Sequence, residues 1–183
     1  NDISNSSNLP IIVYNISQAN LMDLDTLKKL ASIKNIKGVK YTAPTHFNFS
    51  KIKKEISNDF KIYSGMDEMA LSGIISGADG MIGSFYNLMP EMFVNLFSQL
   101  QKGQINEAKK TQEKINIIIV YALEKSGYPF IKMGMNWLGI DSGYVRRPFV
   151  TITDTDVENE IKKDLKILSK ENDLSGIKFL EGL

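Results

Sequence analysis

The stretch Ile36-Lys37-Gly38-Val39-Lys40-Tyr41-Thr42 decides the fold class. It is a short run rich in β-forming residues and bounded by polar segments, which predicts a buried strand. A second run of this kind, residues 9–15, ends on Tyr14-Asn15. Lys40 and Tyr14 therefore stand near the C-terminal ends of two successive predicted strands, where side chains of a β/α protein usually carry function.

Strand and helix patterns alternate around these two runs. Repeated strand–helix units of this length imply parallel strands joined by right-handed crossovers. The predicted strands cover residues 11–14, 36–42, 60–64 and 79–83, and the predicted helices cover residues 23–32, 49–56 and 67–76. Four strands are half of what an eight-stranded β/α barrel needs. The first part of the chain is thus either half of such a barrel or a small open α/β sheet.

After residue 88 only helical patterns remain. They predict helices over residues 90–101, 105–126 and 129–138, a loop over 141–148, and one last helix. Thr155 and Glu158 have the spacing of a capping box, which predicts that Thr155 caps that last helix. We therefore expect two parts, residues 1–88 with four β/α units and residues 89–183 with the last barrel helix and a C-terminal helical subdomain.

Composition excludes several classes of protein. The 183 residues are 43% hydrophobic and 23% charged, with a net charge of +1, which argues against a dedicated nucleic-acid binder. The absence of cysteine excludes disulfides and thiol chemistry and fits a reducing cytoplasm. No apolar run is long enough to span a membrane and no signal peptide is visible, so we expect a cytoplasmic protein. The first residue, Asn1, is not methionine and suggests a fragment or a processed product.

Four ordered motifs carry a resemblance to a known family. The motifs are Tyr14-Asn15-Ile16, Gly38-Val39-Lys40-Tyr41-Thr42, Gly65-Met66-Asp67-Glu68 and the stretch of residues 77–87, GADGMIGSFYN. Together they resemble the pyruvate-dependent class I aldolases of the N-acetylneuraminate lyase and dihydrodipicolinate synthase family. Residues 139–148 are similar to the loop before the last helix in the lyase branch. The resemblance implies that the chain is the C-terminal half of a (β/α)₈ barrel, strands five to eight, with the C-terminal helices.

The resemblance also implies catalytic roles. Lys40 would form a Schiff base with pyruvate, and this chemistry requires a neutral amine, so we expect a partly desolvated lysine. Tyr14 would be the proton shuttle, since a phenol can donate and accept a proton in turn. Thr42 lies two residues after Lys40, so it faces the same side of the strand and could hydrogen-bond the substrate there. No metal and no diffusible cofactor would be needed beyond the covalent imine.

Four further positions match those that bind the polyhydroxylated tail of a sugar acid in the lyase branch: Gly65, Asp67, Glu68 and Ser84. Purely structural interpretations stay open, because Asp67 and Glu68 could cap or favour a helix N-terminus and Ser84 could be a turn residue. Lys40 could likewise be a solvated strand residue and Tyr14 a core residue. The one histidine, His46, is predicted to be solvent-exposed in a loop and has no assigned role.

The chain departs from the family pattern in three places. Ser17 stands where the family usually has proline, and Ala19 stands where the synthase branch has an arginine for its second substrate. The second departure favours the lyase branch. The family also holds the pyruvate carboxylate with a turn that contains a Gly-Gly pair, and this sequence has no such pair. A carboxylate site would therefore have to come from outside this sequence.

The function that the resemblance favours is reversible cleavage of N-acetylneuraminate, a sialic acid, to pyruvate and N-acetylmannosamine by the intact barrel. It implies a homotetramer whose partners are small-molecule substrates, not nucleic acid or membrane. A second hypothesis is another pyruvate-dependent aldolase of the family that acts on a different sugar acid. A third is a non-catalytic half-barrel that pairs with itself through its open strand edges.

Overall fold

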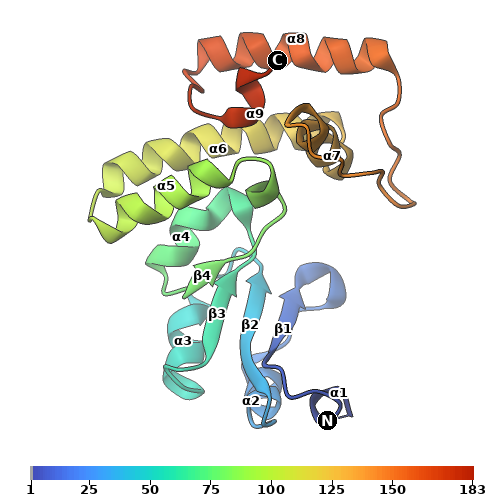
Figure 1. Ribbon diagram of the computed structural model, residues 1–183. Coiled ribbons are helices and arrows are strands. Elements are labelled where there is room, and N and C mark those ends of the chain that lie inside the picture. Colours follow the sequence, from blue (N-terminus) through green and yellow to red (C-terminus); the bar gives the residue numbers. More distant parts are fainter. Residues whose placement is uncertain (1) are drawn as a thin grey trace. The chain divides into compact units, whose positions relative to one another are not determined.

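The computed structural model describes residues 2–183, so Asn1 and its interpretation as a processed start lie outside the described residues. The chain forms two compact units, Asn1–Gly83 and Ser84–Leu183, and each is described by itself. Figure 1 shows the order of their helices and strands along the chain.

The first unit alternates strands with helices, as the sequence predicts. Its elements are α1 (Asp2–Asn5), β1 (Ile11–Ile16), the 3₁₀ helix η1 (Ser17–Ala19), α2 (Leu24–Ala31), β2 (Ile36–Thr42), α3 (Asn48–Glu55), β3 (Lys61–Ser64), η2 (Asp67–Met69), α4 (Ala70–Ile75) and β4 (Gly80–Met81). The helix predicted over residues 67–76 is split, because its first turn is the 3₁₀ helix η2.

The four strands form one parallel sheet in the order β1-β2-β3-β4 (Figure 1). The order matches the chain order, as in successive units of a β/α barrel, and no fifth strand pairs with β1 or β4 among the described residues. With the helices that follow, this arrangement confirms the predicted fold class, half of a β/α barrel followed by helices.

One face of the sheet is covered by α2 and α3. Leu27 from α2 and Phe49 and Ile52 from α3 pack against Val39 and Ile62 of the central strands, and all five side chains are buried. Burial of each large apolar side chain contributes roughly 1.5–3 kcal/mol. Because successive strand residues point to opposite faces, this core leaves the neighbouring position, Lys40, on the other face.

The second unit consists of helices. They are η3 (Phe85–Asn87), α5 (Pro90–Gln101), α6 (Ile105–Lys125), α7 (Tyr128–Trp137), α8 (Thr155–Glu171) and α9 (Lys178–Glu181). Phe130 of α7 is fully buried at the centre of an aromatic group, with Tyr121 of α6, Trp137 of α7 and Phe179 of α9 at ring-centroid distances of 6.0, 6.2 and 6.2 Å. These edge-on contacts join three helices.

The predicted cap of α8 is wrong by one residue. Asp154, not Thr155, is the capping residue, because its carboxylate accepts hydrogen bonds from the backbone N–H groups of Asp156 and Val157. A carboxylate at this position also interacts favourably with the helix dipole, which explains why it takes the place of the neighbouring hydroxyl. Glu158 and Lys162, four residues apart on α8, form an ion pair at 2.7 Å. α8 is not the last helix, because α9 follows it.

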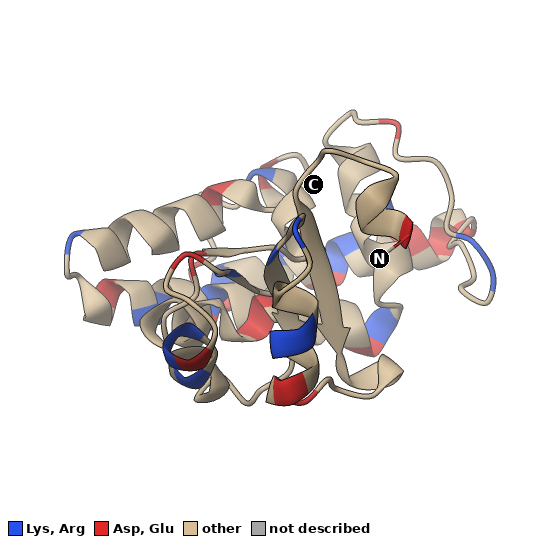
Figure 2. Cartoon of the chain, turned by 90° about the horizontal axis from the view of Figure 1, so that it is seen from below, with Lys and Arg blue, Asp and Glu red and all other residues tan. Residues whose placement is uncertain are grey.

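Charged residues of both signs are spread over the chain (Figure 2), in keeping with the net charge of +1. Among the residues that the structure describes, no helix combines the length and the apolar character that crossing a membrane requires.

His46 is buried, and the prediction that it is exposed is wrong. The side chain is 4% exposed, its ring stacks on Phe49, and its Nδ1 lies 3.0 Å from the hydroxyl of Ser72. Nε2 has no hydrogen-bond partner in the described part of the chain. Burial disfavours the charged imidazolium and lowers the pKa of His46 below its ordinary value. The histidine is thus part of the layer between α3 and α4.

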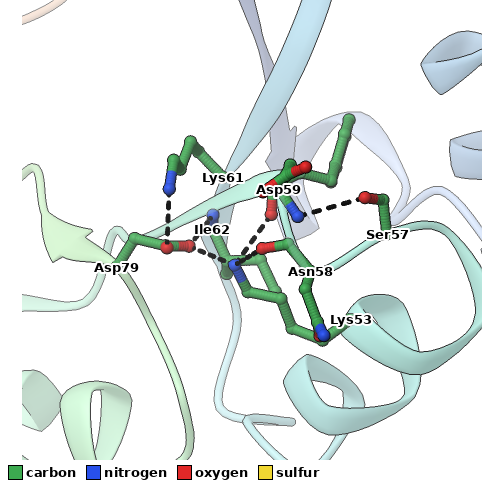
Figure 3. A network of polar contacts seen from close by, with 8 residues as sticks. Lys53, Ser57, Asn58, Asp59, Lys61, Ile62 and Asp79 are labelled. Carbon is green, nitrogen blue, oxygen red and sulfur yellow. Dashed lines mark hydrogen bonds and ion pairs between the residues drawn. The ribbon is translucent and has the colours of Figure 1, made fainter.

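Asp79, in the segment before β4, connects three elements through its carboxylate (Figure 3). It lies 2.6 Å from Lys53 Nζ and 3.3 Å from Lys61 Nζ, and it accepts a hydrogen bond of 2.8 Å from the backbone N–H of Ile62. Partial burial alone would raise the pKa of Asp79, but the hydrogen bonds from Lys53 and Ile62 outweigh it and hold the pKa below the usual value. The carboxylate therefore fixes the start of β3 to α3.

Lys53 extends the same network to the turn between α3 and β3. Its ammonium donates a hydrogen bond of 3.1 Å to the backbone carbonyl of Asn58 (Figure 3). It donates a second one, of 2.9 Å, to the backbone carbonyl of Phe60. One ammonium group thus satisfies two backbone carbonyls of this turn.

We expect the stability of the chain to fall as the pH drops below about 6.5, the pKa of a histidine in an unfolded chain. Because the pKa of His46 is lowered in the folded state, the unfolded chain takes up the proton first, and stability is lost as the pH falls through the folded pKa. Between the two pKa values, the free energy of unfolding would change by up to about 1.4 kcal/mol per pH unit. Urea denaturation at several pH values measures it. His46→Gln should remove the slope, and an unchanged slope in that variant would contradict the assignment.

Asp79→Asn should destabilise the first unit by about 1–3 kcal/mol, because a neutral amide cannot replace charge-assisted hydrogen bonds to Lys53 and Ile62. Urea denaturation together with amide hydrogen exchange at Ile62 measures the loss. Asp59→Asn is the matched control, since the backbone N–H of Asp59, not its carboxylate, takes part in the network. Equal stability of the two variants would show that the Asp79 contacts contribute nothing.

Candidate functional site

The parallel register places Lys40 between two tyrosines. Lys40 on β2 is paired with Tyr14 on β1 and with Tyr63 on β3. Register partners in a sheet point to the same face, so all three side chains lie on the face opposite α2 and α3, which we call the Lys40 face. Lys40 and Tyr14 were predicted from the sequence, whereas Tyr63 was missed. Alternation along the strand over residues 60–64 puts Tyr63 on one face of the sheet, but only pairing with β2 places it beside Lys40.

Lys40 and Tyr14 are in contact. The Lys40 Nζ lies 4.4 Å from the centroid of the Tyr14 ring, a cation–π distance. The Tyr14 side chain is 51% exposed in this chain. A primary amine and a phenol side by side provide a nucleophile and a group that carries protons.

Thr42 and Gly65 complete the group around Lys40. A β-carbon at Gly65 would lie 2.0 Å from the Thr42 hydroxyl oxygen and 3.0 Å from Lys40 Cε, so glycine is what allows these side chains their positions. The backbone N–H of Gly65 donates a 2.9 Å hydrogen bond to the carbonyl of Tyr41, which fixes the turn after β3. The Thr42 hydroxyl is buried and has no hydrogen-bond partner in the described residues. A buried hydroxyl without a partner is a place where a ligand could bind.

Asp67 is 6% exposed and lies next to Gly83, where a β-carbon would fall 1.5 Å from Asp67 Oδ1. It is not a capping residue, because the N-cap position of η2 is Met66 and no side chain caps that helix. Glu68 follows in the same turn and is exposed. Ser84 is the first residue of the second unit and precedes η3, so its contribution to a site with Lys40 stays a prediction.

A cavity of about 240 Å³ in the first unit lies on the other side of the sheet. Tyr41 and Ile52, with neighbours from α2 and α3, line it. Tyr41 alternates with Lys40 along β2, so this cavity is separated from the Lys40 face by the sheet itself. Within residues 2–183, no cluster of three or more His, Asp or Glu residues could hold a metal ion.

Comparison with known proteins gives one consistent family. The family model described as "Dihydrodipicolinate synthetase family" matches residues 1–168. A curated N-acetylneuraminate lyase from Rhizobium meliloti (strain 1021) is 34% identical over 157 residues, which cover 85% of this chain and 52% of the relative. The chain thus spans about half the length of this relative.

Solved structures agree with this result. N-acetylneuraminate lyase from Fusobacterium nucleatum complexed with pyruvate is 30% identical with a TM-score of 0.79, covering 89% of this chain and 56% of that one. CdNal from Clostridium difficile in complex with mannosamine is 29% identical with a TM-score of 0.82, covering 94% and 58%. This half-barrel and its helices are matched by one family model over residues 1–168 of 183. The chain therefore belongs to the dihydrodipicolinate synthetase family.

Proposed function

We propose that this chain carries the Schiff-base half of a pyruvate-dependent aldolase. The observation that carries the proposal is the placement of Lys40 Nζ against Tyr14, with Thr42 and Gly65 beside it. In the cleavage direction the neutral amine of Lys40 attacks the keto carbon of the sugar-acid substrate, and loss of water gives an imine. The protonated imine then accepts the electron pair of the carbon–carbon bond that breaks, while the Tyr14 phenol group takes the proton from the hydroxyl that becomes the aldehyde. The remaining enamine takes up a proton, and hydrolysis of the imine releases pyruvate and restores the Lys40 amine.

The preferred substrate is N-acetylneuraminate, which would be cleaved reversibly to pyruvate and N-acetylmannosamine. The similarity to the Rhizobium meliloti lyase supports this choice, as does Ala19 at the position where the synthase branch has arginine. Asp67, Glu68 and Ser84 would bind the hydroxyl groups of the sugar tail, since carboxylates accept the hydrogen bonds that these groups donate. A different sugar acid is the alternative, which substrate screening would resolve.

We expect efficient cleavage only from a completed barrel. The sequence contains no Gly-Gly turn for the pyruvate carboxylate, and positioning of a substrate supplies a large part of an enzyme's rate. The segment that holds the carboxylate would therefore come from outside these 183 residues. A homotetramer in the cytoplasm is the assembly that the family resemblance implies.

Incubation of the purified chain with pyruvate and borohydride, followed by peptide mass spectrometry, tests the imine. We expect the reduced adduct mainly at Lys40, and we expect Lys40→Arg to lose it, because a guanidinium does not form imines. Tyr14→Phe should keep the adduct but reduce cleavage of N-acetylneuraminate about 10²- to 10⁴-fold, measured in a preparation that cleaves it. Adducts spread evenly over many lysines would overturn the proposal.

Gly65→Ala should reduce the yield of the Lys40 adduct and destabilise the chain by about 1–3 kcal/mol, because the new methyl group would overlap the Thr42 hydroxyl. Mass spectrometry and urea denaturation measure the two effects. Gly182→Ala is the control, since Gly182 has a φ of −91° and no atom lies within 4 Å of an added β-carbon. If both variants behaved alike, the close packing at Gly65 would have no consequence for the site.

A further inference from the structure

The aromatic face of Tyr14, and not only its hydroxyl, meets the Lys40 amine. The distance from Lys40 Nζ to the ring centroid is 4.4 Å. Among the ion pairs of residues 2–183, none includes Lys40, so no carboxylate neutralises its charge there. The electron-rich face of the ring is therefore the group that meets this cation in the described chain.

Tyr63 provides an internal comparison for this contact. It occupies the equivalent register position on the other side of Lys40, and it is the same residue type. Its ring instead covers Gly80 of β4, where a β-carbon would lie 3.2 Å from Tyr63 Cδ1. The two tyrosines that flank Lys40 are thus not equivalent, because one contacts the ammonium and the other fills the space above a glycine.

A cation–π contact attracts an ammonium group but not a neutral amine. Imine formation, in contrast, uses the lone pair of the neutral amine. The ring contact and the proposed reaction therefore require different protonation states of the same nitrogen. The contact seen here belongs to the state before the reaction, and it must be given up when the amine attacks.

We propose that the Tyr14 ring is a positioning group, which holds the Lys40 ammonium in the protein without substrate, and that this role is separate from proton transfer by the Tyr14 hydroxyl. The significance of this role for catalysis rests on the proposed imine chemistry, but the contact itself does not. Tyr14 would then act twice, first through its ring on the waiting amine and later through its hydroxyl on the substrate.

Two substitutions separate the two roles. Tyr14→Phe keeps the ring and removes the hydroxyl, whereas Tyr14→Leu removes both. The exposed position of Tyr14 makes both substitutions compatible with folding, which circular dichroism would verify. Tyr63→Leu is the matched control, because it removes a ring of the same size from the neighbouring strand at the same register.

Nuclear magnetic resonance of the chain with ¹³C-labelled lysine tests the geometry directly. Protons above an aromatic ring are shifted upfield, so we expect the ε-methylene signal of Lys40, assigned by its loss in Lys40→Arg, to lie upfield of the other lysines. The shift should persist in Tyr14→Phe and Tyr63→Leu and vanish in Tyr14→Leu. A Lys40 signal among those of exposed lysines, or a shift that survives Tyr14→Leu, would overturn the proposal.

Amine reactivity gives a second readout. Reductive methylation by formaldehyde and borohydride near neutral pH modifies neutral amines, and exposed Lys37 on the same strand serves as the internal reference. Relative to Lys37, methylation of Lys40 should be about two- to five-fold faster in Tyr14→Leu than in the native chain and in Tyr14→Phe. An equal increase in Tyr63→Leu would show that easier access of the reagent to Lys40, and not loss of the ring contact, is the cause. That result would contradict the proposal.

The outcome also stays distinct from that of the proposed function. If the upfield shift is present and pyruvate does not add to Lys40, the ring contact is real and the aldolase proposal fails. If pyruvate adds to Lys40 and the shift is absent, the aldolase proposal stands and the ring role fails.

Discussion

The parallel register of β1, β2 and β3 is the constraint on which the rest of the first unit depends. It pairs Tyr14 with Lys40 and Lys40 with Tyr63, and it sends Val39 and Tyr41 to the opposite face, where α2 and α3 cover them. A slip of one residue would bury the Lys40 amine and expose the core, so the burial of apolar side chains keeps Lys40 on its face of the sheet.

The strands could be predicted because they depend on local patterns, whereas the roles of the site residues rest on the family resemblance. The predicted strand over residues 36–42, which contains Lys40, coincides with β2. Tyr14, at the end of the first predicted strand, is the register partner of Lys40. Asp154 was missed because two adjacent residues, Asp154 and Thr155, both suit a helix cap, and only the backbone path decides between them.

His46 and Tyr63 were missed for a different reason. The polarity of a histidine in a loop suggests exposure, but the contacts that bury it come from Phe49 and from Ser72, which is 26 residues away. Tyr63 became part of the site only through pairing with β2, which the pattern of its own strand does not specify. Non-local packing decides both positions, and a pattern along the chain does not contain it.

The Asp79 network and the Lys40 group stand at opposite ends of the same strands. Asp79 holds the N-terminal end of β3, whereas Gly65 follows its C-terminal end. This separation gives the scaffold evolvability, because loops at the reactive end can be exchanged without loosening the anchor at the other end. Remodelling of the turns after the strands can thus change what this end of the sheet binds, while the charged anchor at the other end keeps the strands aligned.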